Sequence, residues 1–216
     1  MTEQRVTVKI INSIAHVKLN RADKLNALDM PMFIAIGNGD DFCSGLDVKS
    51  IMKSPTSMVK LLFKALPWQA NLAQVVSTGW QNIPVPVICA IHGRCWGGGL
   101  QIALGADFRF ATPDSSLSIL EGKWGLIPDM GGTIALRDLI AIDQAKRLAM
   151  TAEMFTGQQA LALNLVTEIT ATPLADAQAF AESLIKVMMG KNMQRKVYNQ
   201  THDIEQHKTF LPRKKW

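Results

Sequence analysis

The sequence predicts an α/β fold with a helical C-terminal part. Short strand-like runs alternate with segments of helical spacing as far as about Ala135, which is the pattern of an α/β core. Helical patterns dominate after that point. The 216 residues are enough for one sizeable core with a small appendage.

Turn residues separate the strand-like runs. Val6–Ile11 and Ile14–Leu19 are joined by Asn12-Ser13, which indicates a hairpin. Prolines at the start of 83–91 suit the entry of a buried strand. We expect further strands over 34–36, 108–111 and 117–120, and helices over 58–82, 100–104, 143–150, 156–163 and 174–189.

Composition narrows the class of protein. No apolar run reaches the roughly 20 residues of a membrane span, and the first residues do not resemble a signal peptide. Three cysteines without metal-ligand spacing predict free thiols, a reducing cytoplasmic compartment and no metal site. The net charge of +5 is scattered, apart from Arg213-Lys214-Lys215. Without a nucleic-acid-binding motif, it suits either an ordinary solvated surface or a phosphate-bearing small molecule.

Three glycine-containing blocks carry the candidate chemistry: Ser44–Asp47, His92–Gly99 and Glu121–Thr133. Glycines at the start of a helix let a ligand approach unpaired backbone N–H groups, where an oxyanion is a natural guest. Taken singly, each block is weak, because most glycine triplets are tight turns and most loop carboxylates are solvated or cap a helix.

Together with two further blocks, they resemble in chain order the motifs of the crotonase (enoyl-CoA hydratase/isomerase) superfamily. Leu19–Leu28 resembles its LNRP-x-x-x-NAL opening, and Ser44–Asp47 its (S/A)G(x)D loop. Trp96–Gly99 resembles its GGG turn, Ile127–Thr133 its (I/L)P(x)xGG loop, and Met154–Gly157 its TG turn before a helix.

The resemblance implies a crotonase-like spiral of ββα units over residues 1–170, which would hold the acyl-CoA site. Residues 171–216 would form a helical region for assembly into trimers or hexamers. The implied ligand is an acyl-CoA or enoyl-CoA substrate, with no cofactor besides the CoA carried by the substrate. Nucleic acid and membrane partners are not expected.

The same resemblance assigns site residues by motif position. The backbone N–H groups of Leu46 and Gly98 would form an oxyanion hole for the thioester oxygen, and Glu121 and Asp129 would be the catalytic carboxylates. The residues expected to bind the substrate are Ser44, Gly45, Leu46, Asp47, Gly97, Gly98, Gln101 and Lys24.

Gln101 departs from the hydratase pattern, which has a glutamate there. An amide orients water but cannot accept its proton, so Glu121 and Asp129 favour double-bond isomerisation over hydration. Apolar neighbours (Trp124, Leu126, Ile127) are expected to raise the pKa of a carboxyl group here by desolvation. The alternatives are hydration by Glu121 with Gln101, another acyl-CoA reaction such as dehalogenation, a non-catalytic acyl-CoA-binding role, and RNA binding, which the lack of a basic helix disfavours.

One interval is shorter than the resemblance implies. Only residues 29–33 separate Leu28 from the strand-like 34–36, where a helix, a strand and a connection need about 25 residues. The spacing predicts that a segment is absent from the sequence between Phe33 and Ile34, and that helix is also absent near 189–207. The alternative is a compact family member.

Overall fold

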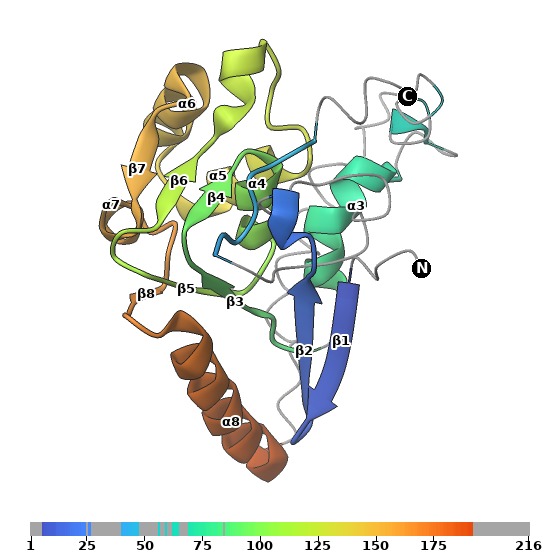
Figure 1. Ribbon diagram of the computed structural model, residues 1–216, viewed down its shortest axis with the longest axis vertical. Helices are drawn as coiled ribbons and strands as arrows, with labels where there is room; N and C mark the ends of the chain where they lie inside the picture. Colours follow the sequence, from blue (N-terminus) through green and yellow to red (C-terminus); the bar gives the residue numbers. More distant parts are fainter. Residues whose placement is uncertain are drawn as a thin grey trace, which may run out of the picture.

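The computed structural model describes residues 6–24, 26, 40–47, 56, 59, 62–64, 69–83 and 85–191. Strands and helices alternate along these ranges, and 3-10 turns (η) join several of them (Figure 1). The elements are β1 (Val6–Ile11), β2 (Ile14–Leu19), η1 (Ala22–Lys24), α3 (Leu72–Thr78), η3 (Gly79–Asn82), β3 (Ile88–Ile91), β4 (Arg94–Trp96), α4 (Gly98–Leu104), β5 (Phe108–Ala111), β6 (Ser116–Ser118), η4 (Leu120–Trp124), α5 (Gly132–Leu139), α6 (Ile142–Thr151), β7 (Met154–Thr156), α7 (Gly157–Ala162), β8 (Glu168–Ile169) and α8 (Pro173–Lys191).

The chain alternates between two three-stranded sheets. One has the order β3-β5-β8 with parallel neighbours, and the other has the order β4-β6-β7, parallel and then antiparallel. The passes β3, β4, α4 and β5, β6, α5 each add one strand to each sheet and then a helix, and in the last pass α7 lies between β7 and β8. The expected ββα spiral is therefore confirmed.

The hairpin β1–β2 forms where the sequence predicts it. Asn12 and Ser13 both have positive φ, which matches the right-handed twist of the paired strands. The sequence predicts one helix over 58–82, but in the structure a separate helix begins after Asn71. Its side chain accepts from the N–H of Gln74, whose own side chain accepts from Asn71, a capping box that opens α3.

The hydrophobic core lies between the two sheets and the helices that cover them. Leu100 and Leu104 of α4, Leu117 of β6 and Leu148 of α6 are all buried there. Helix α8 packs on β3 and β5, with Phe180 against the rings of two β5 phenylalanines. The described part of the region 171–216 thus covers a sheet of the core.

Several predictions fall outside the described residues. These are the strand over 34–36, the junction of Phe33 and Ile34, and residues 192–216 with the basic run Arg213–Lys215. The predicted missing segments and the assembly role of the C-terminal region stay predictions.

Candidate functional site

The first and second glycine blocks meet side by side. Cys43, just before the first block, pairs with Cys95 of β4 in a parallel bridge, through the N–H groups of Cys43 and Trp96. A Cβ atom on Gly45 would lie 2.9 Å from the carbonyl oxygen of Trp96 and 3.6 Å from the nitrogen of Gly98. With φ at +95°, Gly45 allows this close approach, which a side chain would prevent.

This contact places Leu46 next to the start of α4. Leu46 is half-buried against the core, while Gly97 and Gly98 are buried. Gly98 is the first residue of α4, so its N–H has no acceptor within the helix. The two backbone segments that carry these N–H groups thus lie side by side, and the oxyanion hole that they would form stays a prediction.

Asn26 of the opening motif holds the residues just before the first block in place. Its side-chain oxygen accepts from the N–H of Arg21, its side-chain nitrogen donates 2.7 Å to the carbonyl oxygen of Asp41, and its own carbonyl accepts from the thiol of Cys43. Arg21 also forms a 2.9 Å ion pair with Asp47, both side chains being largely buried. Asp47 therefore fixes the loop, and its expected contact with substrate stays a prediction.

Glu121 lies on η4 with its carboxylate against the glycine turn. A Cβ atom on Gly97 would be 3.3 Å from Oε1 of Glu121. That oxygen accepts a 2.6 Å hydrogen bond from Nε2 of Gln101, whereas Oε2 is buried without a hydrogen-bond partner among the described residues. The chain therefore brings Glu121, Gln101 and the Gly97-Gly98 turn together.

Burial raises the pKa of the Glu121 carboxyl group above its ordinary value of 4.5. Hydrogen bonds from its own backbone and from Gln101 oppose this, and the negative charge of Asp129 adds to the increase in pKa. A carboxyl group with a raised pKa is suited to taking up and returning a proton near neutral pH.

The physical source of that burial differs from the expectation. Trp124, Leu126 and Ile127 are 66%, 54% and 70% exposed, so these side chains do not enclose the carboxylate. The left-handed turn at Gly125 ends η4, and the chain then runs along the surface. Among the described residues, the carboxylate lies against Gly97 and the side chain of Gln101 instead.

Asp129 lies in the exposed part of the same loop. It does not cap α5, because the N-cap of that helix is Gly131 and no side chain caps it. Asp129 is close enough to Glu121 for its charge to act there, and its predicted role as a second catalytic carboxylate stays a prediction.

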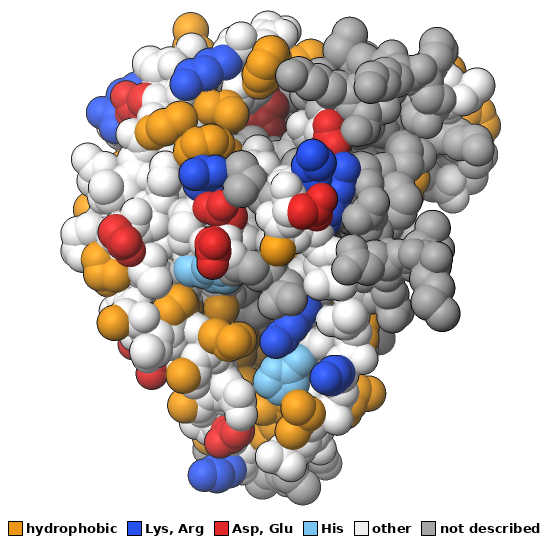
Figure 2. Space-filling view, viewed as in Figure 1, with side chains coloured by type: hydrophobic (Ala, Val, Ile, Leu, Met, Phe, Trp, Pro, Cys, Tyr) orange, Lys and Arg blue, Asp and Glu red, His pale blue; other side chains and the backbone are white. Residues whose placement is uncertain are grey.

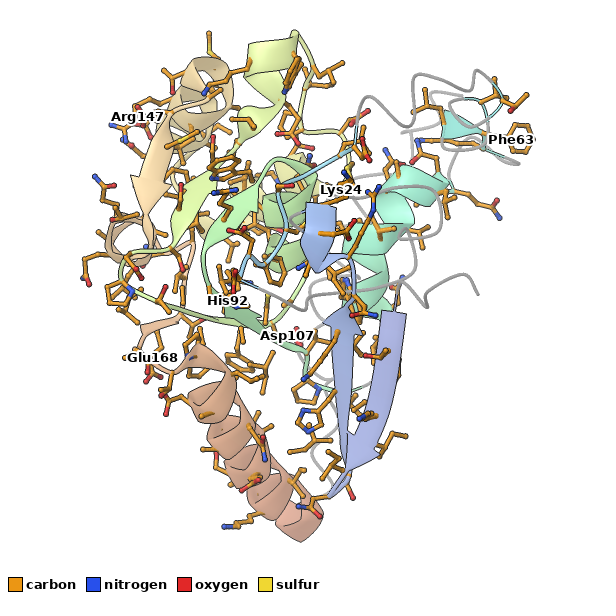
Figure 3. All side chains as sticks on the ribbon, in the orientation of Figure 1. Lys24, Phe63, His92, Asp107, Arg147 and Glu168 are labelled. Carbon is orange, nitrogen blue, oxygen red and sulfur yellow. The ribbon has the colours of Figure 1, made fainter. Side chains whose placement is uncertain are left out.

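Two further predicted residues, Ser44 and Lys24, differ in exposure. Ser44 is half-buried at the start of the first block, and Lys24 ends η1 with an exposed side chain (Figure 3). Sequence reasoning missed the positioning roles of Arg21, Asn26 and Asp41. Their signal was the polar content of the opening motif, whose partners the sequence alone did not reveal.

Other kinds of site find no support in the described part of the chain. No group of three or more His, Cys, Asp or Glu side chains there could hold a metal ion, and no helix there is long and apolar enough to cross a bilayer. On the face in Figure 2, basic and acidic side chains are interspersed among neutral ones.

Comparison with known proteins gives matches over most of the chain. Residues 33–210 match the family model for enoyl-CoA hydratase/isomerase. The chain is 29% identical to the peroxisomal Delta(3,5)-Delta(2,4)-dienoyl-CoA isomerase of Arabidopsis thaliana, with 73% of this chain and 66% of that protein covered. It is 35% identical to the mitochondrial methylglutaconyl-CoA hydratase of Mus musculus, with 59% of this chain and 38% of that protein covered.

A solved structure shares the fold. The crystal structure of enoyl-CoA hydratase from Bacillus anthracis superposes with a TM-score of 0.73 at 25% identity, covering 84% of this chain and 77% of that one. The chain thus spans just under two thirds of the Arabidopsis relative and less than half of the mouse relative. With its ββα spiral and these matches, the chain belongs to the enoyl-CoA hydratase/isomerase family of the crotonase superfamily.

Proposed function

We propose that this protein is an enoyl-CoA isomerase that moves a carbon–carbon double bond by proton transfer through Glu121. The observation that carries the proposal is the partly buried carboxylate of Glu121 at the glycine turn, which is held at Oε1 and has no partner at Oε2 among the described residues. A 1,3-proton shift needs one group that removes a proton and returns it two carbons away. Glu121 supplies that group.

The thioester oxygen would bind between the N–H groups of Leu46 and Gly98. Removing a proton next to the thioester places negative charge on that oxygen, and two preoriented donors stabilise it as it forms. The approach of Gly45 to the nitrogen of Gly98 supports this assignment, because it brings the two donor segments within reach of one atom.

The substrate class is an enoyl-CoA thioester, and the four residues 44–47 would line its thioester end. The relatives named above support the class, since their names specify a dienoyl-CoA and a methylglutaconyl-CoA. Cytoplasmic location and assembly into trimers or hexamers belong to the same proposal. The two relatives are named as peroxisomal and mitochondrial proteins.

The test is turnover of 3-enoyl-CoA and 2-enoyl-CoA thioesters of several chain lengths, with products separated by chromatography and mass. We expect isomers of unchanged mass, and we expect Glu121→Gln to lose about 10²–10⁴-fold in kcat. A reaction run in D₂O should retain part of the substrate hydrogen, because one shielded carboxyl group carries it. If the protein binds the thioesters but turns over none of them, a non-catalytic acyl-CoA-binding role is left.

Hydration of a 2-enoyl-CoA is the second candidate. The observation in its favour is the amide nitrogen of Gln101 beside Glu121, which has a second hydrogen that can orient a water molecule. The same assay separates the two reactions, because hydration adds the mass of water to the product.

A further inference from the structure

One buried amide joins three elements of the candidate site. Gln101 on α4 is 2% exposed and donates from Nε2 to Oε1 of Glu121 on η4. Its own Oε1 accepts a 3.0 Å hydrogen bond from the N–H of Gly132, the first residue of α5. The side chain thus takes the place of a capping side chain for α5, which has none of its own.

The two hydrogen bonds determine which way the amide points. Only the oxygen of a carboxamide accepts from an N–H group, and only its nitrogen donates to a carboxylate. Turning the amide over would set donor against donor at Gly132 and oxygen against oxygen at Glu121. The donor to Glu121 is therefore held in place by a helix whose start lies 31 residues further along the chain.

The hydrogen bond from Gln101 makes the two carboxylate oxygens of Glu121 unequal. Oε1 is engaged by Gln101, while Oε2 is buried with no partner among the described residues. A buried polar atom without a partner costs about 1–3 kcal/mol, so the arrangement is stable only because the rest of the site maintains it. Oε1 is also the oxygen nearer to Gly97, so Oε2 is the carboxylate oxygen that is left without a partner among the described residues.

We propose that Gln101 is a positioning residue that holds Glu121 by Oε1, leaves Oε2 as the atom that exchanges protons with the substrate, and ties this geometry to the first turn of α5. The inference rests on the proposed function, which makes Glu121 the proton carrier. In the step, a substrate C–H bond breaks, an O–H bond forms on Oε2, and the electron pair enters the enolate. The same proton then returns to the other carbon, so that no external acid is consumed.

The test compares Gln101→Met and Gln101→Glu with the unaltered protein. Methionine keeps the length of the side chain but removes the donor, and glutamate keeps the acceptor for Gly132 but faces Glu121 with a second carboxylate. Both changes remove a hydrogen bond that stabilises ionised Glu121, and the like charge adds to this in Gln101→Glu. We therefore expect the pKa of the Glu121 carboxyl group to rise in both, more in Gln101→Glu.

The pKa is read from the ¹³C signal of the Glu121 carboxyl group during a pH titration, which needs no turnover. In kinetics, the acid limb of kcat should move to higher pH, with kcat reduced at least about 10-fold and KM within about 3-fold. Ser77→Ala is the matched control, because the Ser77 hydroxyl donates to the main-chain carbonyl of the same glutamine. That variant should lose stability and leave the carboxyl pKa unchanged.

An unchanged Glu121 pKa in both Gln101 variants, or an equal shift in Ser77→Ala, overturns the positioning role. Failure of the proposed function looks different, since the unaltered protein would then turn over none of the enoyl-CoA thioesters. In that case the ¹³C titration still decides whether Gln101 holds the carboxylate.

Discussion

At the scale of single residues, Glu121 makes stability depend on pH in the opposite sense to an ordinary surface carboxylate. Because burial raises its pKa in the folded protein, the protonated form is favoured there. Its contribution to stability is fully present below the unfolded pKa and is lost as pH rises through the folded pKa. Ionised Glu121 therefore lowers the free energy of unfolding at neutral pH.

Glu121→Gln should consequently melt at a higher temperature than the unaltered protein at pH 7 and show no such gain at pH 4. The amide stays neutral, and its oxygen still accepts from Gln101. Thermal unfolding of both proteins across this pH range measures the difference. A lower melting temperature of the variant at pH 7 contradicts the assignment of a raised pKa.

The charge of the exposed Asp129 side chain acts on the carboxyl group of Glu121. Asp129→Asn removes a negative charge that raises the pKa of Glu121, so the acid limb of the rate profile should move to lower pH. We expect a smaller loss of kcat than in Glu121→Gln. A loss as large as that of Glu121→Gln would instead give Asp129 a proton-transfer step of its own.

Two neighbouring glycines should fail in different ways. Gly98→Val places a branched side chain where the thioester must approach the backbone, and we expect kcat/KM to fall at least about 10²-fold with little loss of stability. Gly99→Ala is the comparison. A Cβ atom there would lie 2.5 Å from the carbonyl oxygen of Cys43, so the fold should lose about 1–3 kcal/mol. Normal turnover by Gly98→Val would refute the oxyanion assignment.

At the scale of elements, the sequence predicted what local patterns encode. The hairpin β1–β2, strand β5 and helices α4, α6, α7 and α8 all lie where periodicity and turn residues indicate. The short strands β4, β7 and β8 and the turn η4 were missed. Strands of two or three residues are too short to show alternation, and they exist because neighbouring turns of the spiral pair with them.

The candidate site shows the same division. Glu121, Leu46 and Gly98 could be proposed from their motifs, and the structure brings their segments together. The partners that orient them could not be found, because Gln101 meets Gly132 across 31 residues and Asn26 meets Asp41 across 15. Such contacts depend on how the elements pack, and residue type alone does not predict that packing.

Asn26 offers a test at this scale. Asn26→Ala removes the buried hydrogen bonds of its side chain with the N–H of Arg21 and the carbonyl oxygen of Asp41, so stability should fall by about 2–4 kcal/mol. Urea unfolding measures the loss. Asn164→Ala is the control, because Asn164 is exposed and also has positive φ. Equal losses in both variants would assign the effect to the backbone conformation alone.

At the scale of the whole molecule, the cysteines report on the integrity of the core. Cys43, Cys89 and Cys95 are free and buried, and burial raises the pKa of the Cys43 and Cys89 thiols to about 12. At pH 8 only about one in 10⁴ of such thiols is ionised. The native protein should therefore resist iodoacetamide at pH 8, and all three cysteines should react in urea. Rapid labelling of the native protein would contradict the packing described for the core.

The paired growth of the two sheets has a consequence for how the chain can be shortened. Since β7 belongs to one sheet and β8 to the other, a chain that stops after α6 loses an edge strand from both sheets at once. The strands β5 and β6 would then present unpaired backbone edges, which invite other chains to pair with them. The segment with β7 and β8 therefore has two roles: it belongs to the core, and it covers the strand edges at which other chains could pair and aggregate.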